Sequence, residues 1–276
     1  MKLCFITARR NPPLPSQIVL DVSEILFRRG YEVESFITEE NLTRLDSLDT
    51  KNTLYLLKSY TDLSLSLAGV LHAQGARLLN SYPSSAACRN KIIACQYLRA
   101  GGIPSPRSWV TGDTNLLLSL LKTTPLIVKP CMGWRGIGVK VVRTSEDVKA
   151  LPIYDEPMLI QEFLEGTGED LRIYVAGDQV FAIRKPFSTI SYAVPGRLCP
   201  VTPQERDIAL RCGKAFGLGL YGIDIIETPQ GPSVVDVNCF PGYKGAPNAA
   251  EAVADYIESY ADGQISQTIP TLRSEA

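Results

Sequence analysis

Short apolar runs alternate with amphipathic stretches over residues 3–80 of the chain. Helical spacing of apolar positions over Ser16–Arg29 and Thr61–Gln74 predicts two helices, and Gly30 and Gly75 stand where these helices would end. Alternation of strands with helices is typical of a parallel α/β unit, which we place at residues 1–82. The apolar runs that predict its strands are Leu3–Thr7, Glu32–Phe36, Thr53–Leu57 and Arg77–Asn80.

The loop Arg9–Pro15 follows the first predicted strand and contains three prolines but no glycine. This composition excludes the glycine-rich fingerprint of a dinucleotide-binding fold. Arg9 and Arg10 leave two interpretations open. They belong either to a solvated loop or to a contact with a substrate anion at the carboxyl end of a strand.

A small second lobe is predicted for residues 83–156. One helix, Ser84–Ala100, opens after Pro83 and ends at Gly101-Gly102, and a stiff extended link follows. The rest of this lobe combines helices at Asn115–Leu121 and after Ser145 with the strands Leu126–Pro130 and Gly138–Val142.

From Pro157 the pattern becomes mainly antiparallel, which predicts a third, α+β lobe at residues 157–276. Its predicted helices are Pro203–Phe216 and Ala249–Tyr260. Its predicted strands are Met158–Phe163, Leu171–Val175, Val180–Arg184, Tyr221–Glu227 and Ser233–Asn238.

Composition narrows the classes of function. With 28 basic and 29 acidic residues, no global field favours nucleic acid or an anionic membrane as a partner. Seven scattered cysteines without a Cys-x-x-Cys pair predict neither a disulfide framework nor a zinc cluster, so we expect a cytoplasmic location. No apolar run approaches the roughly 18 residues of a membrane span. The only histidine, His72, lies in an apolar helix, which argues against histidine-dependent catalysis.

A lysine and a glycine-rich loop stand at the end of an apolar strand. Lys129 is followed by Gly133, Gly136 and Gly138, whose backbone amides can approach phosphate oxygens while the lysine adds a positive charge. A Walker P-loop is excluded because no Lys-Ser/Thr follows and because the loop joins two strands. The loop is either a mobile lid over a nucleotide or an ordinary hairpin.

Two neighbouring strands carry acidic and amide side chains. Alternation places Asp236 and Asn238 on one face of their strand, with Val235 and Val237 on the other, and Asp224 lies between two isoleucines. Acids in apolar strands need a cation or a basic partner. Oxygen ligands suit Mg²⁺ or Mn²⁺, and pairing with internal Lys or Arg is the alternative.

Further polar groups border the second and third lobes. The strand that ends in Gln161, Glu162, Phe163 and Leu164 can offer backbone groups to an adenine edge, and the acids that follow it can bind ribose hydroxyls. A salt-bridged surface explains those acids equally well. Three basic residues on alternating strands could point into one cleft, namely Arg172, Arg184 and Lys185.

Taken in order, these motifs resemble the ATP-grasp superfamily, and within it the RimK-type carboxylate–amine ligases. The resemblance covers roughly residues 80–260, and the first eighty residues fit the α/β domain that precedes the grasp. The motifs that carry it are Arg89-Asn90-Lys91, Gly101-Gly102-Ile103-Pro104, Val128-Lys129-Pro130 with the glycine loop, Gln161-Glu162-Phe163, Asp170-Leu171-Arg172, Gly222-Ile223-Asp224 and Asp236-Val237-Asn238 followed by Pro241-Gly242.

The resemblance implies the ATP-grasp fold, with a pre-ATP-grasp domain, a central lid lobe and a C-terminal lobe that holds the metal site. It also implies an activity in which ATP phosphorylates a carboxylate and an amine captures the acylphosphate to give an amide, ADP and phosphate. The implied partners are therefore a small amino-acid-like acid and an amine, and a homo-oligomer is left open. The implied roles are phosphate binding by Lys91 and Lys129, adenine framing by Gln161, Glu162 and the Phe163 and Leu164 backbone, ribose binding by Asp170, magnesium binding by Asp224, Asp236 and Asn238, and acylphosphate stabilisation by Arg172 and Arg184.

Three departures from the RimK pattern keep alternatives open. Asp236 stands where glutamate is usual, and the stretch Pro186–Pro200 lacks the expected asparagine and paired glycines. The stretch Asp236–Tyr243 is also similar to the inositol polyphosphate kinases of this superfamily, in which a hydroxyl accepts the phosphoryl group. The RimK-like glycine loop and the absence of a dense basic cluster favour the ligase. A non-catalytic ATP-binding module is disfavoured because it does not need three metal ligands.

Overall fold

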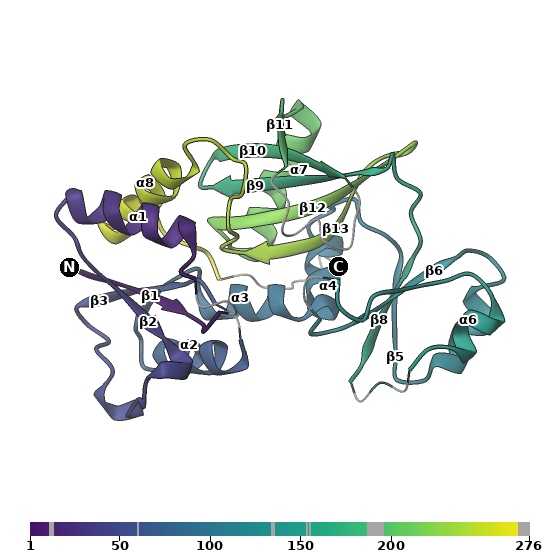
Figure 1. Ribbon diagram of the computed structural model, residues 1–276, viewed down its shortest axis with the longest axis horizontal. Helices are drawn as coiled ribbons and strands as arrows, with labels where there is room; N and C mark the ends of the chain where they lie inside the picture. The colour runs from purple at the N-terminus through teal and green to yellow at the C-terminus, as the bar shows by residue number, and fades with distance from the viewer. Residues whose placement is uncertain are drawn as a thin grey trace.

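The computed structural model describes residues 1–10, 14–59, 61–133, 136–152, 154, 156–186 and 196–269. These residues form three sheets, of four, five and four strands. Figure 1 shows the N-terminal sheet and the central sheet at opposite ends of the molecule, with the five-stranded sheet between them. No helix in the described ranges is long and apolar enough to cross a membrane.

The N-terminal sheet is parallel throughout, as the alternating pattern predicts, with the strand order β2-β1-β3-β4. Alternate residues of β1 face opposite cores: Leu3 and Phe5 pack with α1, whereas Cys4 and Ile6 pack with α2. The elements are β1 (Lys2–Thr7), α1 (Gln17–Arg28), β2 (Glu32–Ile37), the 3₁₀ turns η1 (Thr38–Glu40) and η2 (Leu45–Ser47), β3 (Thr53–Leu57), α2 (Asp62–Ala73) and β4 (Arg77–Leu79).

The single helix expected over Ser84–Ala100 is instead two helices, α3 (Tyr82–Arg89) and α4 (Lys91–Ala100). Asn90 separates them because its backbone is extended, with φ −94° and ψ 106°. Its side chain accepts hydrogen bonds from the N–H groups of Ile92 (3.0 Å) and Ile93 (3.3 Å), so it caps α4. The break presents Lys91 at the first position of a helix.

The five-stranded sheet is antiparallel and has the order β11-β10-β9-β12-β13. Helices α4 and α7 (Pro203–Phe216) cover one face, and α8 (Ala249–Ala261) covers part of the other. The short edge strand β11 (Arg197–Cys199) was not predicted from the sequence. The other strands are β9 (Glu169–Ala176), β10 (Gln179–Pro186), β12 (Leu220–Thr228) and β13 (Gly231–Cys239).

The central sheet is also antiparallel, in the order β5-β8-β6-β7. It contains β8 (Met158–Glu162), which the sequence pattern places in the third lobe, and β5 (Ser108–Thr111), which that pattern does not predict. The boundaries proposed at residues 82 and 156 stay predictions. The other elements are η3 (Thr114–Leu116), α5 (Leu117–Leu120), β6 (Leu126–Pro130), β7 (Lys140–Val142) and α6 (Ser145–Lys149).

A buried asparagine joins the N-terminal sheet to the five-stranded sheet. The Asn80 side chain donates to the Leu220 carbonyl (2.6 Å) and accepts from the N–H groups of Gly219 and Leu220, both at 3.1 Å. One apolar cluster spans both units, since Leu3 and Phe5 of β1 share it with Tyr174 of β9 and with α8. The two sheets therefore share a core.

Candidate active site

One face of the five-stranded sheet carries the charged residues singled out in the sequence. Arg172 of β9 lies opposite Asp224 of β12, and Asp224 lies opposite Asp236 of β13. Residues opposite each other on paired strands share a face, so these three side chains project together. The reverse face of β9 carries Leu171 and Ile173, which pack on α4 and α7.

Arg172 and Asp224 form a bidentate ion pair. The Arg172 Nε donates to Asp224 Oδ1 at 2.5 Å, and Nη2 donates to Oδ2 at 2.9 Å. Burial raises the pKa of the Asp224 carboxyl, the Arg172 charge opposes that shift, and the Asp236 charge adds to it. Burial alone would lower the pKa of Arg172, but the charge of Asp224 raises it above its ordinary value. The pair keeps Arg172 charged in a partly desolvated site.

Asp236 has its own basic partner. The Lys91 Nζ lies 2.6 Å from Asp236 Oδ1, and the Lys91 backbone N–H donates to the Cys131 carbonyl at 3.0 Å. The Asn238 Nδ2 reaches Asp224 Oδ2 at 3.5 Å. The three predicted metal ligands therefore converge, but here basic residues pair with both acids, which is the alternative that the sequence left open. Magnesium binding by these residues stays a prediction.

The simple alternation expected along β13 is wrong at one position. The register of β12 and β13 shifts between Asp224 and Ile225, so Asp236 and Val234 pair with β12 while Val235 is the extra residue of a β-bulge. Val234 and Val237 are buried on the helical side, and the Val235 carbonyl accepts from the Lys129 Nζ at 3.4 Å. The bulge thus directs a backbone oxygen of β13 toward the central sheet.

Lys129 and Gln161 meet where β6 and β8 face that bulge. The Lys129 Nζ donates to Gln161 Oε1 at 2.7 Å, and Gln161 in turn donates to Ser108 Oγ at 3.0 Å. Burial is the main cause that lowers the pKa of Lys129, to about 8. Gln161 is 2% exposed, so its side chain orients the lysine within the site.

The other residues expected to bind adenine and ribose have contacts of their own. The Glu162 carboxylate pairs with Arg107, its Oε2 lying 2.7 Å from the arginine Nε. The Phe163 N–H donates to the Pro125 carbonyl at 2.9 Å. Burial and the charge of Asp224 raise the pKa of Asp170 on β9. Leu164 is partly buried after β8. The roles expected of these four residues remain predictions.

The expectation that Arg172 and Arg184 point into one cleft is wrong. Arg172 lies opposite Ile183 in the β9–β10 pairing, so Arg184 projects from the other face, where it forms an ion pair with Glu227. The neighbouring Lys185 projects from the Arg172 face and is 1% exposed. Burial, followed by the charges of Arg172 and Lys244, lowers the pKa of Lys185. The pairing register between β9 and β10 could not be read from the sequence.

The glycine loop begins as a tight turn after β6. The Gly133 N–H donates to the Pro130 carbonyl at 3.1 Å, and Gly136 and Gly138 have φ values of +74° and +77°, which favour glycine. A Cβ built on Gly138 would lie 2.7 Å from Pro130 Cγ. Trp134 and Arg135 of this loop lie outside the described residues, as do residues 187–195 of the stretch Pro186–Pro200.

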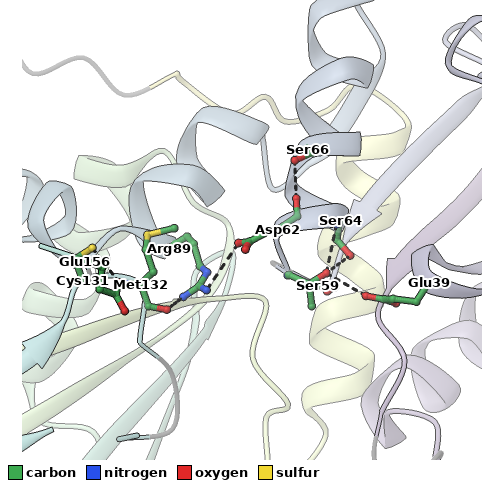
Figure 2. Close-up of polar contacts among 10 residues, drawn as sticks. Glu39, Ser59, Asp62, Ser64, Ser66, Arg89, Cys131, Met132 and Glu156 are labelled. Carbon is green, nitrogen blue, oxygen red and sulfur yellow. Dashed lines mark hydrogen bonds and ion pairs between the residues drawn. The ribbon is translucent and has the colours of Figure 1, made fainter. Parts of the chain in front are cut away.

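The contacts that hold the start of this loop were not predicted from the sequence (Figure 2). Arg89 of α3 donates to the Met132 carbonyl and lies 4.0 Å from Asp62 at the start of α2. The Glu156 carboxylate accepts from the Met132 N–H at 3.3 Å and from the Cys131 thiol at 3.4 Å. The only sequence signal is that Arg89 stands two residues before Lys91. Charged side chains from two distant segments therefore hold the first residues of the loop.

Sequence comparison identifies relatives of this arrangement. The family model of the RimK-like ATP-grasp domain matches residues 88–257. A probable alpha-L-glutamate ligase of Coxiella burnetii is 32% identical over 210 residues, which cover 68% of this chain and 69% of that protein. The segment that the family model matches contains Lys91, Lys129, Asp224 and Asp236.

Solved structures show the same fold. A RimK domain ATP-grasp protein from Sphaerobacter thermophilus has a TM-score of 0.75 and 17% identity, covering 93% of this chain and 99% of that chain. A D-alanine–D-alanine ligase from Bacillus anthracis, solved with ATP, has a TM-score of 0.67 and 20% identity, covering 95% of this chain and 96% of that chain. The ATP-grasp fold implied by the sequence motifs is confirmed. The chain belongs to the RimK-like ATP-grasp family and is an ATP-dependent ligase that joins a carboxylate to an amine.

Proposed function

We propose that this ligase activates the carboxylate of a small amino-acid-like substrate as an acylphosphate, and that L-glutamate is one of its two substrates. A carboxylate oxygen attacks the γ-phosphorus of ATP, and the bond to the ADP oxygen breaks. The amine nitrogen then attacks the acyl carbon, phosphate leaves with its oxygen, and the amine gives up a proton. The name of the Coxiella burnetii relative supports glutamate.

The observation that carries this proposal is the meeting of Lys91 and Lys129 with Asp236. Two lysines from different elements reach one strand, Lys91 by an ion pair to Asp236 at 2.6 Å and Lys129 by a hydrogen bond to the adjacent Val235 carbonyl. Phosphoryl transfer needs positive charge held in position and little covalent chemistry from the protein. We assign both lysines to the phosphates of ATP, with the amides of Gly136 and Gly138 beside them, since the Gly133 N–H already donates to the Pro130 carbonyl.

The donor set of Asp224, Asp236 and Asn238 suits Mg²⁺, which prefers oxygen ligands, and Mn²⁺ accepts the same set. In the described ranges no group of three or more His, Cys, Asp or Glu side chains could hold a metal ion. The candidate set is therefore two carboxylates with one amide oxygen. A bound cation would neutralise charge on the phosphate oxygens. Arg172 and Lys91 now hold the two acids, and each could turn to phosphate oxygens once its acid binds a cation.

Arg172 and Lys185 are our candidates for stabilising the acylphosphate. They project from the same face of the sheet, beside Asp224 and Asp170 respectively. Fixed positive charge in a buried position needs little reorganisation when negative charge develops on the transferred phosphoryl group. Lys185 takes the place in this proposal that the sequence had assigned to Arg184.

Interception of the activated acid tests the function. With Mg-ATP, L-glutamate or another amino acid, and hydroxylamine in place of the amine, we expect a hydroxamate and one ADP for each hydroxamate. The Asp236→Asn variant should lose this product, whereas Lys122→Met on the exposed surface should keep it. A stable phosphate ester on an alcohol would indicate the kinase instead. Nucleotide binding without any ADP release would indicate the non-catalytic module.

A further inference from the structure

The buried amide of Gln161 has two possible orientations, and only one of them suits Lys129. The side chain ends in an oxygen that accepts hydrogen bonds and an NH2 group that donates them, whereas a lysine ammonium only donates. In the structure the Gln161 Oε1 lies 2.7 Å from the Lys129 Nζ, and Gln161 is 2% exposed. Because water hardly reaches this side chain, neighbouring protein groups have to select its orientation.

Strand pairing places a serine on the other side of this amide. Ser108 of β5 lies opposite Gln161 of β8, and Gln161 lies opposite Ile127 of β6. Residues opposite each other share a face, and Lys129 stands two residues after Ile127 on the same strand. The polar side chains of Ser108, Gln161 and Lys129 therefore follow one another across the sheet, with Gln161 in the middle.

The Ser108 hydroxyl donates its proton away from Gln161. Its Oγ donates to the Pro106 carbonyl at 2.9 Å, and a hydroxyl has only one proton. Toward Gln161 the hydroxyl can therefore only accept, and it accepts from Nε2 at 3.0 Å. This contact directs the NH2 group toward β5 and leaves the amide oxygen for Lys129.

The thiol of Cys95 is a weaker neighbour of the same amide. Its Sγ lies 3.5 Å from Gln161 Nε2 and 3.7 Å from Ser108 Oγ. Burial is the main cause that raises the pKa of the Cys95 thiol, so the thiol is uncharged at neutral pH. Its sulfur is then a weak acceptor, and Ser108 is the stronger of the two groups that orient the amide.

Lys129 depends on this orientation for its shorter contact. Its other acceptor is the Val235 carbonyl, at 3.4 Å, compared with 2.7 Å to Gln161. If the amide turned over, its NH2 group would face the ammonium, and two groups that only donate would meet. Lys129 would then leave the position that it occupies beside β13.

We propose that Ser108 is a positioning residue, whose hydroxyl orients the Gln161 amide so that this amide holds the Lys129 ammonium where ATP binds. This inference rests on the proposed function, because it takes Lys129 as a ligand of the ATP phosphates. Ser108 acts through Gln161 and needs no contact of its own with ATP.

Threonine and valine have nearly the same shape, so they separate the hydroxyl from the size of the side chain. Ser108→Thr keeps the hydroxyl, whereas Ser108→Val lacks it and fills the space that a water molecule would need. Thr111→Val is the matched control, because it removes a hydroxyl from the opposite face of the same strand. Calorimetry with Mg²⁺ and a non-hydrolysable ATP analogue gives the dissociation constant without turnover, and the thermal midpoint reports folding.

We expect Ser108→Val to weaken binding of the analogue at least fivefold, and Ser108→Thr and Thr111→Val to stay within twofold of wild type. Lys129→Met should weaken binding at least tenfold. Adding Ser108→Val to Lys129→Met should then change binding less than twofold, because the lysine that depends on Ser108 is gone. A merely structural role of Ser108 would produce the same fivefold loss in both backgrounds, which would overturn the proposal. Equal binding by Ser108→Val and Ser108→Thr would also overturn it.

Failure of the proposed function gives a different pattern. If no acid yields a hydroxamate but the binding results hold, the substrate assignment is wrong and the role of Ser108 stands. If the hydroxamate forms and Ser108→Val binds the analogue as wild type does, the role of Ser108 alone is overturned. Unchanged binding by Lys129→Met would overturn both the assignment of Lys129 to the phosphates and the role of Ser108.

Discussion

Asp224→Asn separates the two roles that this carboxylate can have, as partner of Arg172 and as ligand of a cation. The substitution preserves the size of the side chain and one acceptor oxygen but removes its charge. Arg172 then loses one of two charge-assisted hydrogen bonds, of 2.5 and 2.9 Å, and keeps its own charge in a partly desolvated position. We therefore expect a loss of stability before any ligand is added.

The expected loss of stability depends on how exposed the Arg172 and Asp224 side chains are. Removing one partner of a fully buried pair costs about 3–5 kcal/mol. The Arg172 and Asp224 side chains retain 25% and 21% exposure, so solvent screens part of the effect. We expect a loss of roughly 1–3 kcal/mol in the free energy of unfolding. For a protein of this size that corresponds to a decrease of roughly 2–5 °C in the thermal midpoint.

Mg-ADP distinguishes the cation role from the ion-pair role. A ligand at a hundredfold excess over its dissociation constant adds about 2.7 kcal/mol to the stability of the native state. We expect Asp224→Asn to lose most of the Mg²⁺-dependent part of this gain, and at least a thousandfold in the rate of ADP release. Arg172→Met should also be destabilised, but it should keep the Mg²⁺-dependent gain because Asp224 remains.

The measurements are thermal unfolding with and without Mg-ADP, and ADP release with the acid substrate. A double variant should lose about as much unfolding free energy as either single variant, since the two changes remove the same pair. The reasoning is refuted if Asp224→Asn keeps the full Mg²⁺-dependent gain and a near-normal rate. The acid would then serve only as the partner of Arg172.

Three further outcomes follow from the site. Burial lowers the pKa of Lys129 in the folded protein to about 8, so its buried charge destabilises the native state below pH 8. This cost disappears as the pH rises from 8 toward the pKa that Lys129 has in the unfolded chain. Lys129→Met should therefore raise the thermal midpoint of the nucleotide-free protein at pH 7 and raise it less at pH 9.5. The same variant should weaken ATP binding at least tenfold. A lower thermal midpoint at pH 7 would contradict the expected direction. Lys185→Met should reduce hydroxamate formation at least a hundredfold. Arg184→Gln, on the opposite face of the sheet, should stay within about threefold of wild type. A larger loss in Arg184→Gln than in Lys185→Met would contradict the pairing register of β9 and β10. Glu156→Gln should raise KM for ATP more than it lowers kcat and should speed amide hydrogen exchange near Met132, and unchanged exchange would show that the carboxylate does not anchor the loop.

Local patterns predicted most elements of the fold because local physics decides them. Pro203–Phe216 has a Thr202 capping box at its start and Gly217 in the left-handed conformation at its end, and both signals are readable in the sequence. The break at Asn90 was missed because the apolar spacing continues across it. The edge strands β5 and β11 were missed because they are short and largely exposed, so they lack an apolar run.

The site was predictable in residue type and less so in arrangement. Which side chains share a face depends on pairing between strands that are distant in sequence. One residue of register separates Lys185 from Arg184, and no local pattern distinguishes the two. The bulge at Val235 and the inclusion of β8 in the central sheet have the same origin.

The bonds made by Asn80 determine which part of the molecule is able to move. The N-terminal and five-stranded sheets share one apolar core, with Asn80 bonded to the backbone of Gly219 and Leu220, whereas the central sheet packs a separate core of its own. Separating the first two sheets would expose apolar surface and buried polar groups, but tilting the central sheet disturbs neither core. The N-terminal and five-stranded sheets therefore form one unit, and the central sheet is the part that can tilt against it at the lowest cost. Asp224 and Asp236 belong to this unit, whereas Lys129 and the start of the glycine loop belong to the central sheet, so a tilt of that sheet changes the distance between the two groups.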